Sequence, residues 1–544
     1  MTRFPDISSW KGRFAALACI MVLPFLRFLL QRRYSLFHLD VAVAVVFLAA
    51  TCLVLSVVAR KDPVFWIVAL LGILLVSGTP VQRVTDRLLG LSIGWVLGIL
   101  AVLTVTLMRL LRKDFFHIVL VFALSSFAVD VARFFLPQSV PQASGYSPVI
   151  NGAHLPHMLY IILDEHIGTG GIPDDLPQGR AAARRIEETF AQYNFQLYPR
   201  AFSNYSMTLE SIPSILNRRL LENKTAQLNE PETGARWGIY SFRENRLFSE
   251  CAARGYAIHV YQYHSIDYCT SGLDVQTKTE YSDDLETLNH NRGPWFAHFQ
   301  WIVGNYQRSD FLLSRFNGLF PFRFRARLVE PLGVAHIWPA LLADNIVAAD
   351  KKTLFFAHLM VPHRPYLYRP DGGIRNITEW LDDDLEPSFD RQTYLNKYRR
   401  YFDQLEHVRT DLEWLLQFLK QAGVLDSMLI VIHGDHGSRI RYVQKDLFSG
   451  QGRLKRSMLD RYDYVSRPEL RDLLNRFSTL LAIRFPKAQA PVMVSEKGSV
   501  LRFLNQALYQ NENRALPPEA DSVYLFDEND RPREIRLIDE WTEE

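Results

Sequence analysis

Five apolar stretches occupy the first 136 residues of this 544-residue chain, and a polar chain of about 400 residues follows them. The stretches are residues 14–30, 41–59, 64–78, 88–108 and 115–136. A helix needs roughly 20 apolar residues to cross a membrane. The second, fourth and fifth stretches reach that length, whereas the third is short and the first contains an arginine. The pattern predicts a multi-pass membrane domain, residues 1–136, with about five helices.

Basic residues in the short loops predict how these helices are oriented. If the N-terminus is cytoplasmic, eight Lys and Arg residues fall in inner loops and four in outer loops. Positively charged loops stay in the cytoplasm, and no Lys or Arg occurs between Leu136 and Arg180. An odd number of spans then places the polar chain outside the cytoplasm, whereas an even number reverses that placement.

Charge and cysteine content constrain the polar chain further. The net charge of +3 gives no strong basic field, so we expect no nucleic-acid partner. Cys251 and Cys269 form one disulfide if this part is external, or remain two free thiols. Prolines with Ser and Gly between them predict a linker over residues 137–155.

The rest of the polar chain alternates between two patterns. Apolar runs at 157–164, 257–261, 353–359 and 427–433 predict buried parallel strands, and 180–193, 241–254 and 394–422 have helical periodicity. This alternation predicts an α/β fold with a doubly wound sheet. Such sheets bind ligands beyond the carboxyl ends of their strands.

Polar side chains follow three of these strands. Asp164 ends the first run, with Glu165 beside it, and the Asp435-His436 pair ends the last one between two glycines. Adjacent Asp and His side chains reach one metal ion where glycines allow a sharp turn, although a surface turn has the same sequence. His363 lies between two prolines after the third strand, where it is either displayed toward a site or simply exposed. His358 is expected inside that strand as a satisfied buried residue.

A segment rich in hydroxyl side chains, residues 203–216, allows two interpretations. Thr208 or Ser211 caps the start of a helix, or the hydroxyl at that position is a nucleophile. The positive end of a helix dipole favours both an alkoxide and a bound oxyanion.

In this order, the four segments resemble the alkaline phosphatase superfamily, specifically its sulfatase-like membrane branch. That branch includes lipoteichoic acid synthases and phosphoethanolamine transferases. The resemblance covers residues 156–490, and a later segment, 480–486, resembles an apolar strand that ends in Arg-x-Pro. It implies transmembrane helices followed by a doubly wound alkaline-phosphatase-like (sulfatase) domain, with residues 491–544 as a C-terminal extension.

The resemblance also implies a role for individual residues. It matches the metal ligands to Asp164, Thr208, Asp435 and His436, with Thr208 also the catalytic nucleophile. His363 matches the histidine that contacts the transferred group, and Arg439 is a further candidate for substrate binding without a motif match. The donor set favours Zn²⁺ or Mn²⁺ over Ca²⁺.

One departure bears on the reaction. Many sulfatases convert a Cys or Ser in a Cys/Ser-x-Pro-x-Arg motif to formylglycine, and neither frame around Thr208 supplies that motif. We therefore expect a metal-dependent phosphotransferase in the plasma (inner) membrane, acting on phospholipid head groups or cell-envelope glycans. The alternatives are a sulfate or phosphate ester hydrolase and a non-catalytic binding protein.

Overall fold

The computed structural model describes residues 9–31, 34, 36, 38–58, 156–173, 175–223, 227–229, 240–269, 273–281, 298–299, 302, 330–335, 337–375, 391–440, 470–509, 518–526 and 532–536. The chain divides into two compact units. The first comprises Met1–Gln142, Asp284–Leu328 and Arg375–Ile377, and the second comprises Ala143–Asp283, Val329–Ile374 and Thr378–Glu544.

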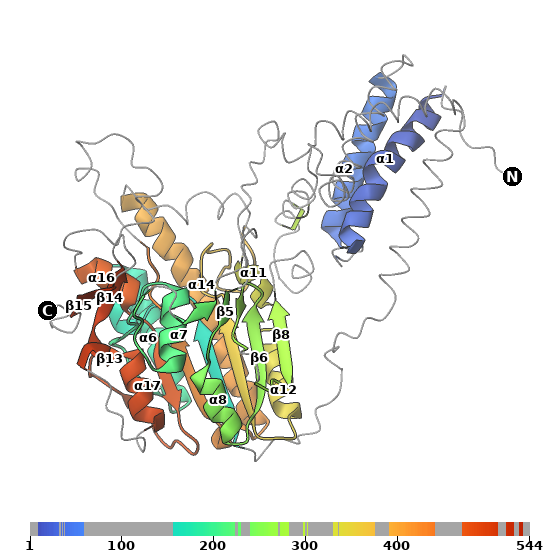
Figure 1. Ribbon diagram of the computed structural model, residues 1–544. Coiled ribbons are helices and arrows are strands. Elements are labelled where there is room, and N and C mark those ends of the chain that lie inside the picture. Colours follow the sequence, from blue (N-terminus) through green and yellow to red (C-terminus); the bar gives the residue numbers. More distant parts are fainter. Residues whose placement is uncertain are drawn as a thin grey trace. The chain divides into compact units, whose positions relative to one another are not determined.

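The first unit contains two long apolar helices, α1 (Trp10–Gln31) and α2 (Leu39–Val58), which pack against each other (Figure 1). Both are long and apolar enough to cross a membrane, and they match the first two predicted spans. The other predicted spans, 64–78, 88–108 and 115–136, and the predicted linker at 137–155 lie outside the described residues.

The second unit is built on an eight-stranded sheet. Its strands, in spatial order, are β12 (Val492–Met493), β2 (Gln196–Leu197), β11 (Leu481–Arg484), β10 (Leu429–Gly434), β1 (Met158–Leu163), β9 (Thr353–Leu359), β6 (Ala257–Tyr263) and β8 (Thr277–Tyr281). The strands from β10 to β8 are all parallel, whereas β11 runs antiparallel to both its neighbours. The predicted α/β fold is confirmed, and all four predicted strands are present.

Helices cover both faces of this sheet. In Figure 1, α7 (Thr208–Asn217), α8 (Arg246–Ala253) and α17 (Val500–Tyr509) lie in front of it, and α12 (Ala340–Ala348) and α14 (Arg391–Gln421) lie behind it. The helix α6 (Pro177–Gln192) packs against α14. Because β1 is buried on both faces, all six of its residues are apolar.

Short elements complete this unit. They are β3 (Ala201–Phe202) with β13 (Gly498–Ser499), β4 (Leu228–Asn229) with β5 (Tyr240–Phe242) and β7 (Ile266–Asp267), β14 (Val523–Phe526) with β15 (Pro532–Ile535), and the helices α11 (Glu330–Val334) and α16 (Leu470–Phe477).

Two details differ from the sequence interpretation. The predicted helix at 241–254 begins only at Arg246, because the Asn245 side chain accepts a hydrogen bond from the backbone N–H of Phe248 and caps the helix there. The sheet also continues past the predicted boundary at residue 490, since β12 pairs with β2. The domain boundaries themselves stay predictions.

Strand register places the carboxyl ends of three strands at one level. Leu163 pairs with Leu359 of β9 on one side and with Gly434 of β10 on the other. The residues that follow, Asp164 and Asp435, therefore leave the sheet side by side at the edge where parallel sheets bind ligands.

Candidate metal and catalytic site

Asp164, Asp435 and His436 form a buried group at this edge, and each offers one ligand atom within 4.8 Å of the others. All three side chains are inaccessible to solvent. The sequence placed these residues about 270 positions apart, and the parallel pairing of β1 with β10 brings them together.

Asp435 is held rigidly by the backbone around it. Its Oδ1 atom accepts hydrogen bonds from the N–H groups of Glu165, at 2.9 Å, and His436, at 2.8 Å. Burial alone would raise the pKa of this carboxyl, but the neighbouring imidazoles of His436 and His358 and the hydrogen bond from the Glu165 N–H lower that pKa below its usual range. Gly434 is required beside it, because a Cβ there would lie 2.3 Å from Oγ1 of Thr479. Oδ2 has no hydrogen-bond partner among the described residues.

Asp164 has a similar arrangement. Its Oδ2 atom accepts a hydrogen bond from the Thr208 hydroxyl at 3.3 Å and lies 3.2 Å from Nε2 of His358. The other nitrogen of His358 is 2.7 Å from the hydroxyl of Tyr268, which fixes the imidazole in the strand. Oδ1 of Asp164 is buried and has no partner in the described part of the chain. Each carboxylate thus keeps one buried oxygen without a hydrogen-bond partner among the described residues, and Oδ2 of Asp435 lies 3.1 Å from Nε2 of His436. Buried acidic oxygens in this arrangement call for a cation.

Thr208 is the first residue of α7, directly after Met207, whose side chain makes no capping hydrogen bond. Its Oγ1 atom lies 3.3 Å from Nε2 of His436, so the hydroxyl belongs to the same group as the carboxylates. The Ser211 hydroxyl, unlike that of Thr208, donates a hydrogen bond to the backbone oxygen of Asp435. Neither hydroxyl caps the helix in the manner that the sequence allowed.

Glu165 occupies the centre of a second group, with His363 and Arg439. It adopts a left-handed backbone conformation, with φ of 62°, and its carboxylate is fully buried. One oxygen accepts two hydrogen bonds from the guanidinium of Arg439, with Nε at 3.0 Å, and lies 3.7 Å from Nε2 of His363. Burial opposes the charge of Glu165, but His363, Arg439 and Arg364 outweigh it and lower the pKa to about 2. Arg439 therefore pairs with Glu165, and His363 lies beside it with 13% of its side chain exposed.

Sequence reasoning missed a contribution from α14. The Tyr401 hydroxyl donates to the backbone oxygen of Glu165 at 2.7 Å and accepts from the N–H of Ile167 at 3.0 Å. It fixes the turn after β1 that presents the two acidic residues. A tyrosine inside an amphipathic helix has the same pattern as a core residue, so the sequence offers no signal for this role.

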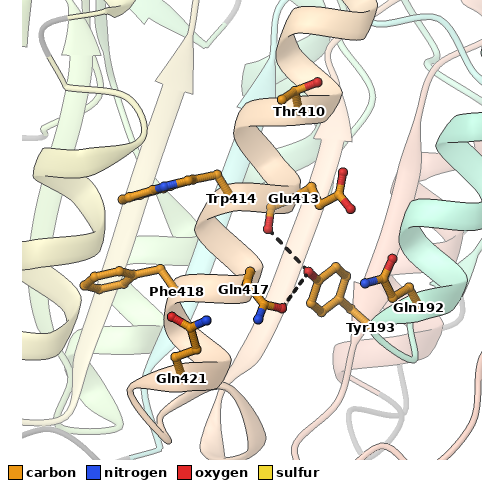
Figure 2. Close-up of a pocket in the computed structure, with 8 residues that line it drawn as sticks. All are labelled: Gln192, Tyr193, Thr410, Glu413, Trp414, Gln417, Phe418 and Gln421. Atoms are coloured by element: carbon orange, nitrogen blue, oxygen red, sulfur yellow. Dashed lines mark hydrogen bonds between the residues drawn. The ribbon is translucent and has the colours of Figure 1, made fainter.

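A cavity of about 580 Å³ lies elsewhere, between the end of α6 and the C-terminal part of α14. Figure 2 shows Tyr193 hydrogen bonded to Glu413 and Gln417, with Trp414 stacked near Phe418. None of the predicted site residues lines this cavity. Its lining does not provide a set of metal ligands, so the site at the end of β1 remains the candidate for catalysis.

The chain is similar to several solved structures at low sequence identity. They include a phosphonate monoester hydrolase from Agrobacterium radiobacter, with 14% identity, 68% of this chain and 79% of that chain covered, and a TM-score of 0.37. The lipoteichoic acid synthase LtaP from Listeria monocytogenes has 12% identity, with 69% and 78% covered and a TM-score of 0.35. The C-terminal periplasmic domain of EptC from Escherichia coli has 12% identity, with 64% and 80% covered and a TM-score of 0.34.

No curated protein matches the chain. A family model does match it, the sulfatase model, over residues 176–465, which is more than half of the sequence. The match confirms the resemblance drawn from the ordered motifs. The chain belongs to the sulfatase family.

Proposed function

We propose that this protein is a metal-dependent, membrane-anchored phosphotransferase that uses Thr208 as its nucleophile. The observation that carries the proposal is the position of the Thr208 hydroxyl, 3.3 Å from both Asp164 and His436 and at the N-terminus of α7. A hydroxyl placed among metal ligands and at the positive end of a helix dipole is activated for attack on an anionic group.

The spacing of the donor atoms fits a small divalent ion. Ligands around tetrahedral Zn²⁺, with bonds of roughly 2.0–2.1 Å, lie about 3.3 Å from one another. The Thr208 hydroxyl is 3.3 Å from Asp164 and His436, and Asp435 Oδ2 is 3.1 Å from His436 Nε2. Two carboxylates, one imidazole and one hydroxyl favour Zn²⁺ or Mn²⁺ over Ca²⁺. Such an ion, when bound, lowers the pKa of the hydroxyl and offsets charge on phosphoryl oxygens.

The reaction that we propose has two displacements. The Thr208 hydroxyl loses its proton as its oxygen attacks phosphorus, the bond between phosphorus and the leaving oxygen breaks, the leaving oxygen takes up a proton, and a phosphothreonine intermediate forms. An acceptor hydroxyl, or water, then attacks phosphorus and releases the Thr208 oxygen. The acceptor hydroxyl or the water gives up a proton as its bond to phosphorus forms, and the departing Thr208 oxygen takes one up.

His363 is the residue that we assign to the leaving group. Its imidazole lies 3.7 Å from Glu165 and has some solvent exposure, so it can exchange protons and face a substrate. Arg439, a candidate for substrate binding from the sequence, forms an ion pair with Glu165. This pair leaves less of the guanidinium charge to attract a substrate anion. We propose that the ion pair of Arg439 with Glu165 fixes His363 beside the transferred group.

We propose that the helices α1 and α2, which are long and apolar enough to cross a membrane, anchor this chemistry there. We propose that the catalytic domain lies outside the cytoplasm, as the distribution of basic loop residues predicts. A domain tethered beside a bilayer meets lipid head groups at high effective concentration, which favours a phospholipid donor and a lipid or envelope-glycan acceptor.

Intact-mass analysis tests the proposal. We expect the full-length protein, incubated in vesicles of membrane phospholipids, to gain a phosphorus-containing group on Thr208, and the Thr208→Ala variant to gain none. Release of sulfate from a chromogenic sulfate ester, with no mass added by any phospholipid, would instead make the protein a sulfate ester hydrolase.

A further inference from the structure

A second group of potential ligands lies in the first compact unit, apart from the candidate catalytic site. His38, Asp40 and His298 each offer one ligand atom within 4.8 Å of the others. His38 and Asp40 flank Leu39, the first residue of α2. Nδ1 of His38 lies 3.9 Å from Oδ1 of Asp40. His298 comes from a segment 258 positions later than Asp40.

The Tyr34 hydroxyl joins the three side chains. It donates to Asp40 at 2.7 Å and lies 3.1 Å from Nδ1 of His38 and 3.4 Å from Nδ1 of His298. A hydroxyl has one proton, so it can donate to one of these groups only. Four side chains with oxygen or nitrogen donors therefore converge on one point.

Burial makes this convergence unusual. Asp40 is 2% exposed, His298 is 8% exposed and Tyr34 is fully buried. Within the described residues, the Asp40 carboxylate contacts a phenol and an imidazole but no Lys or Arg. A buried carboxylate is costly unless a positive charge compensates it.

His298 supplies an independent observation. Its Nε2 atom is buried and has no hydrogen-bond partner in the part of the chain that the structure describes. Buried polar atoms are nearly always paired, and an unpaired one needs an explanation. Histidine is the commonest protein ligand for transition metals, and a metal ion provides that explanation.

We propose that His38, Asp40 and His298, with Tyr34 at the centre, bind a divalent transition-metal ion, of which Zn²⁺ fits best. Two imidazoles and one carboxylate form a ligand set that Zn²⁺ takes in proteins, with the phenol or a water in the fourth position. The charge of the ion compensates the buried Asp40. His38, whose side chain is 35% exposed, leaves a path for entry.

The consequence is a link between two distant parts of the chain. The site ties the segment at residue 298, inserted after β8, to the connection between α1 and α2. If α1 and α2 cross the membrane, residue 298 lies on the same side as that connection, whatever the number of spans after α2. The proposal does not depend on the proposed catalytic reaction.

Metal binding by the full-length protein in detergent tests this site. The variant Asp435→Asn/His436→Ala removes two of the four candidate catalytic ligands and so weakens that site, and ligand variants made in this background then show where a retained ion is bound. We expect one equivalent of Zn²⁺ after dialysis, measured by elemental analysis, and tetrahedral d–d absorption when Co²⁺ replaces it.

Ligand variants in the same background locate the ion. His298→Ala and Asp40→Asn should each lower Zn²⁺ affinity by more than the roughly tenfold to hundredfold cost of losing an outer partner. His264→Gln, which changes a partly buried histidine outside both groups, should leave the bound Zn²⁺ unchanged. Gel filtration of each variant controls for folding.

Two results would overturn the proposal. One is the absence of bound Zn²⁺ and of a Co²⁺ spectrum in the Asp435→Asn/His436→Ala protein, which would make the four side chains a hydrogen-bonded cluster only. The other is one retained equivalent, with unchanged affinity, in a folded His298→Ala variant. The first result is measured on a protein in which Tyr34, His38, Asp40 and His298 are all unchanged. It therefore tests the proposal even if the variants at these four residues fail to fold.

Discussion

Oγ1 of Thr208 lies 3.3 Å from Nε2 of His436, although 228 positions separate the two residues in the chain. The start of α7 and the turn after β10 meet at this point. The contact puts a potential nucleophile within the same set of atoms as the potential metal ligands, and most of our predictions follow from it.

We expect Thr208→Ala to lower kcat by at least about 10³-fold, because it removes the nucleophile. Thr208→Ser should keep measurable turnover, since a hydroxyl remains. Ser214→Ala removes a buried hydroxyl from the same helix and should change kcat little. Steady-state kinetics with a phosphodiester substrate measures all three. Near-normal turnover in the alanine variant would exclude Thr208 as nucleophile.

Removal of the metal should abolish activity reversibly. Chelation leaves the Asp164 and Asp435 carboxylates without a compensating charge, and we expect Zn²⁺ or Mn²⁺, but not Ca²⁺, to restore turnover. Asp435→Asn should resist restoration, whereas Asp426→Asn, at an exposed carboxylate, should behave as the wild type does. Undiminished activity after exhaustive chelation, checked by elemental analysis, would contradict a metal-dependent reaction.

Stability should depend on the charge of Glu165. Its pKa is about 2 in the folded protein, against an ordinary value of 4.5. Because the folded pKa is lower, the ionised group stabilises the fold above pH 4.5, by about 3 kcal/mol, and this contribution is lost as the pH falls toward 2.

The Glu165→Gln variant measures that contribution. We expect its thermal midpoint, recorded in a chelating buffer, to lie below that of the wild type at pH 6 and to approach it at pH 3. Glu188→Gln, at an exposed glutamate of α6, serves as the control. A difference between Glu165→Gln and wild type that stays constant across this range would show that the Glu165 charge does not stabilise the fold.

The catalytic domain should be accessible from outside the cell membrane. In a cysteine-free background, we expect Arg184→Cys, on the exposed face of α6, to react with a membrane-impermeant maleimide in sealed spheroplasts. Lys11→Cys, near the start of α1, should react only after lysis. The opposite labelling pattern would place the domain in the cytoplasm.

Much of the fold was predictable because local patterns decide it. The run from Met158 to Leu163 is apolar throughout, as a strand buried on both faces must be, and an acidic residue at its end marks the binding edge. The start of α8 was harder, because capping by Asn245 outweighs the helical periodicity of the residues before it. The cysteines also left two alternatives open, and in the structure Cys251 and Cys269 are free thiols.

Residue types and their order along the chain determined the family and the candidate ligands, since Asp164, Thr208, Asp435 and His436 each follow a recognisable local signal. Tertiary structure decided which contacts the residues around these ligands make. Arg439, expected to meet a substrate anion, pairs with Glu165, and Tyr401 supports the turn from a helix more than 230 positions away. Such pairings depend on which buried charges and hydrogen-bonding groups the packing brings within a few ångströms, and spacing along the chain does not encode those distances.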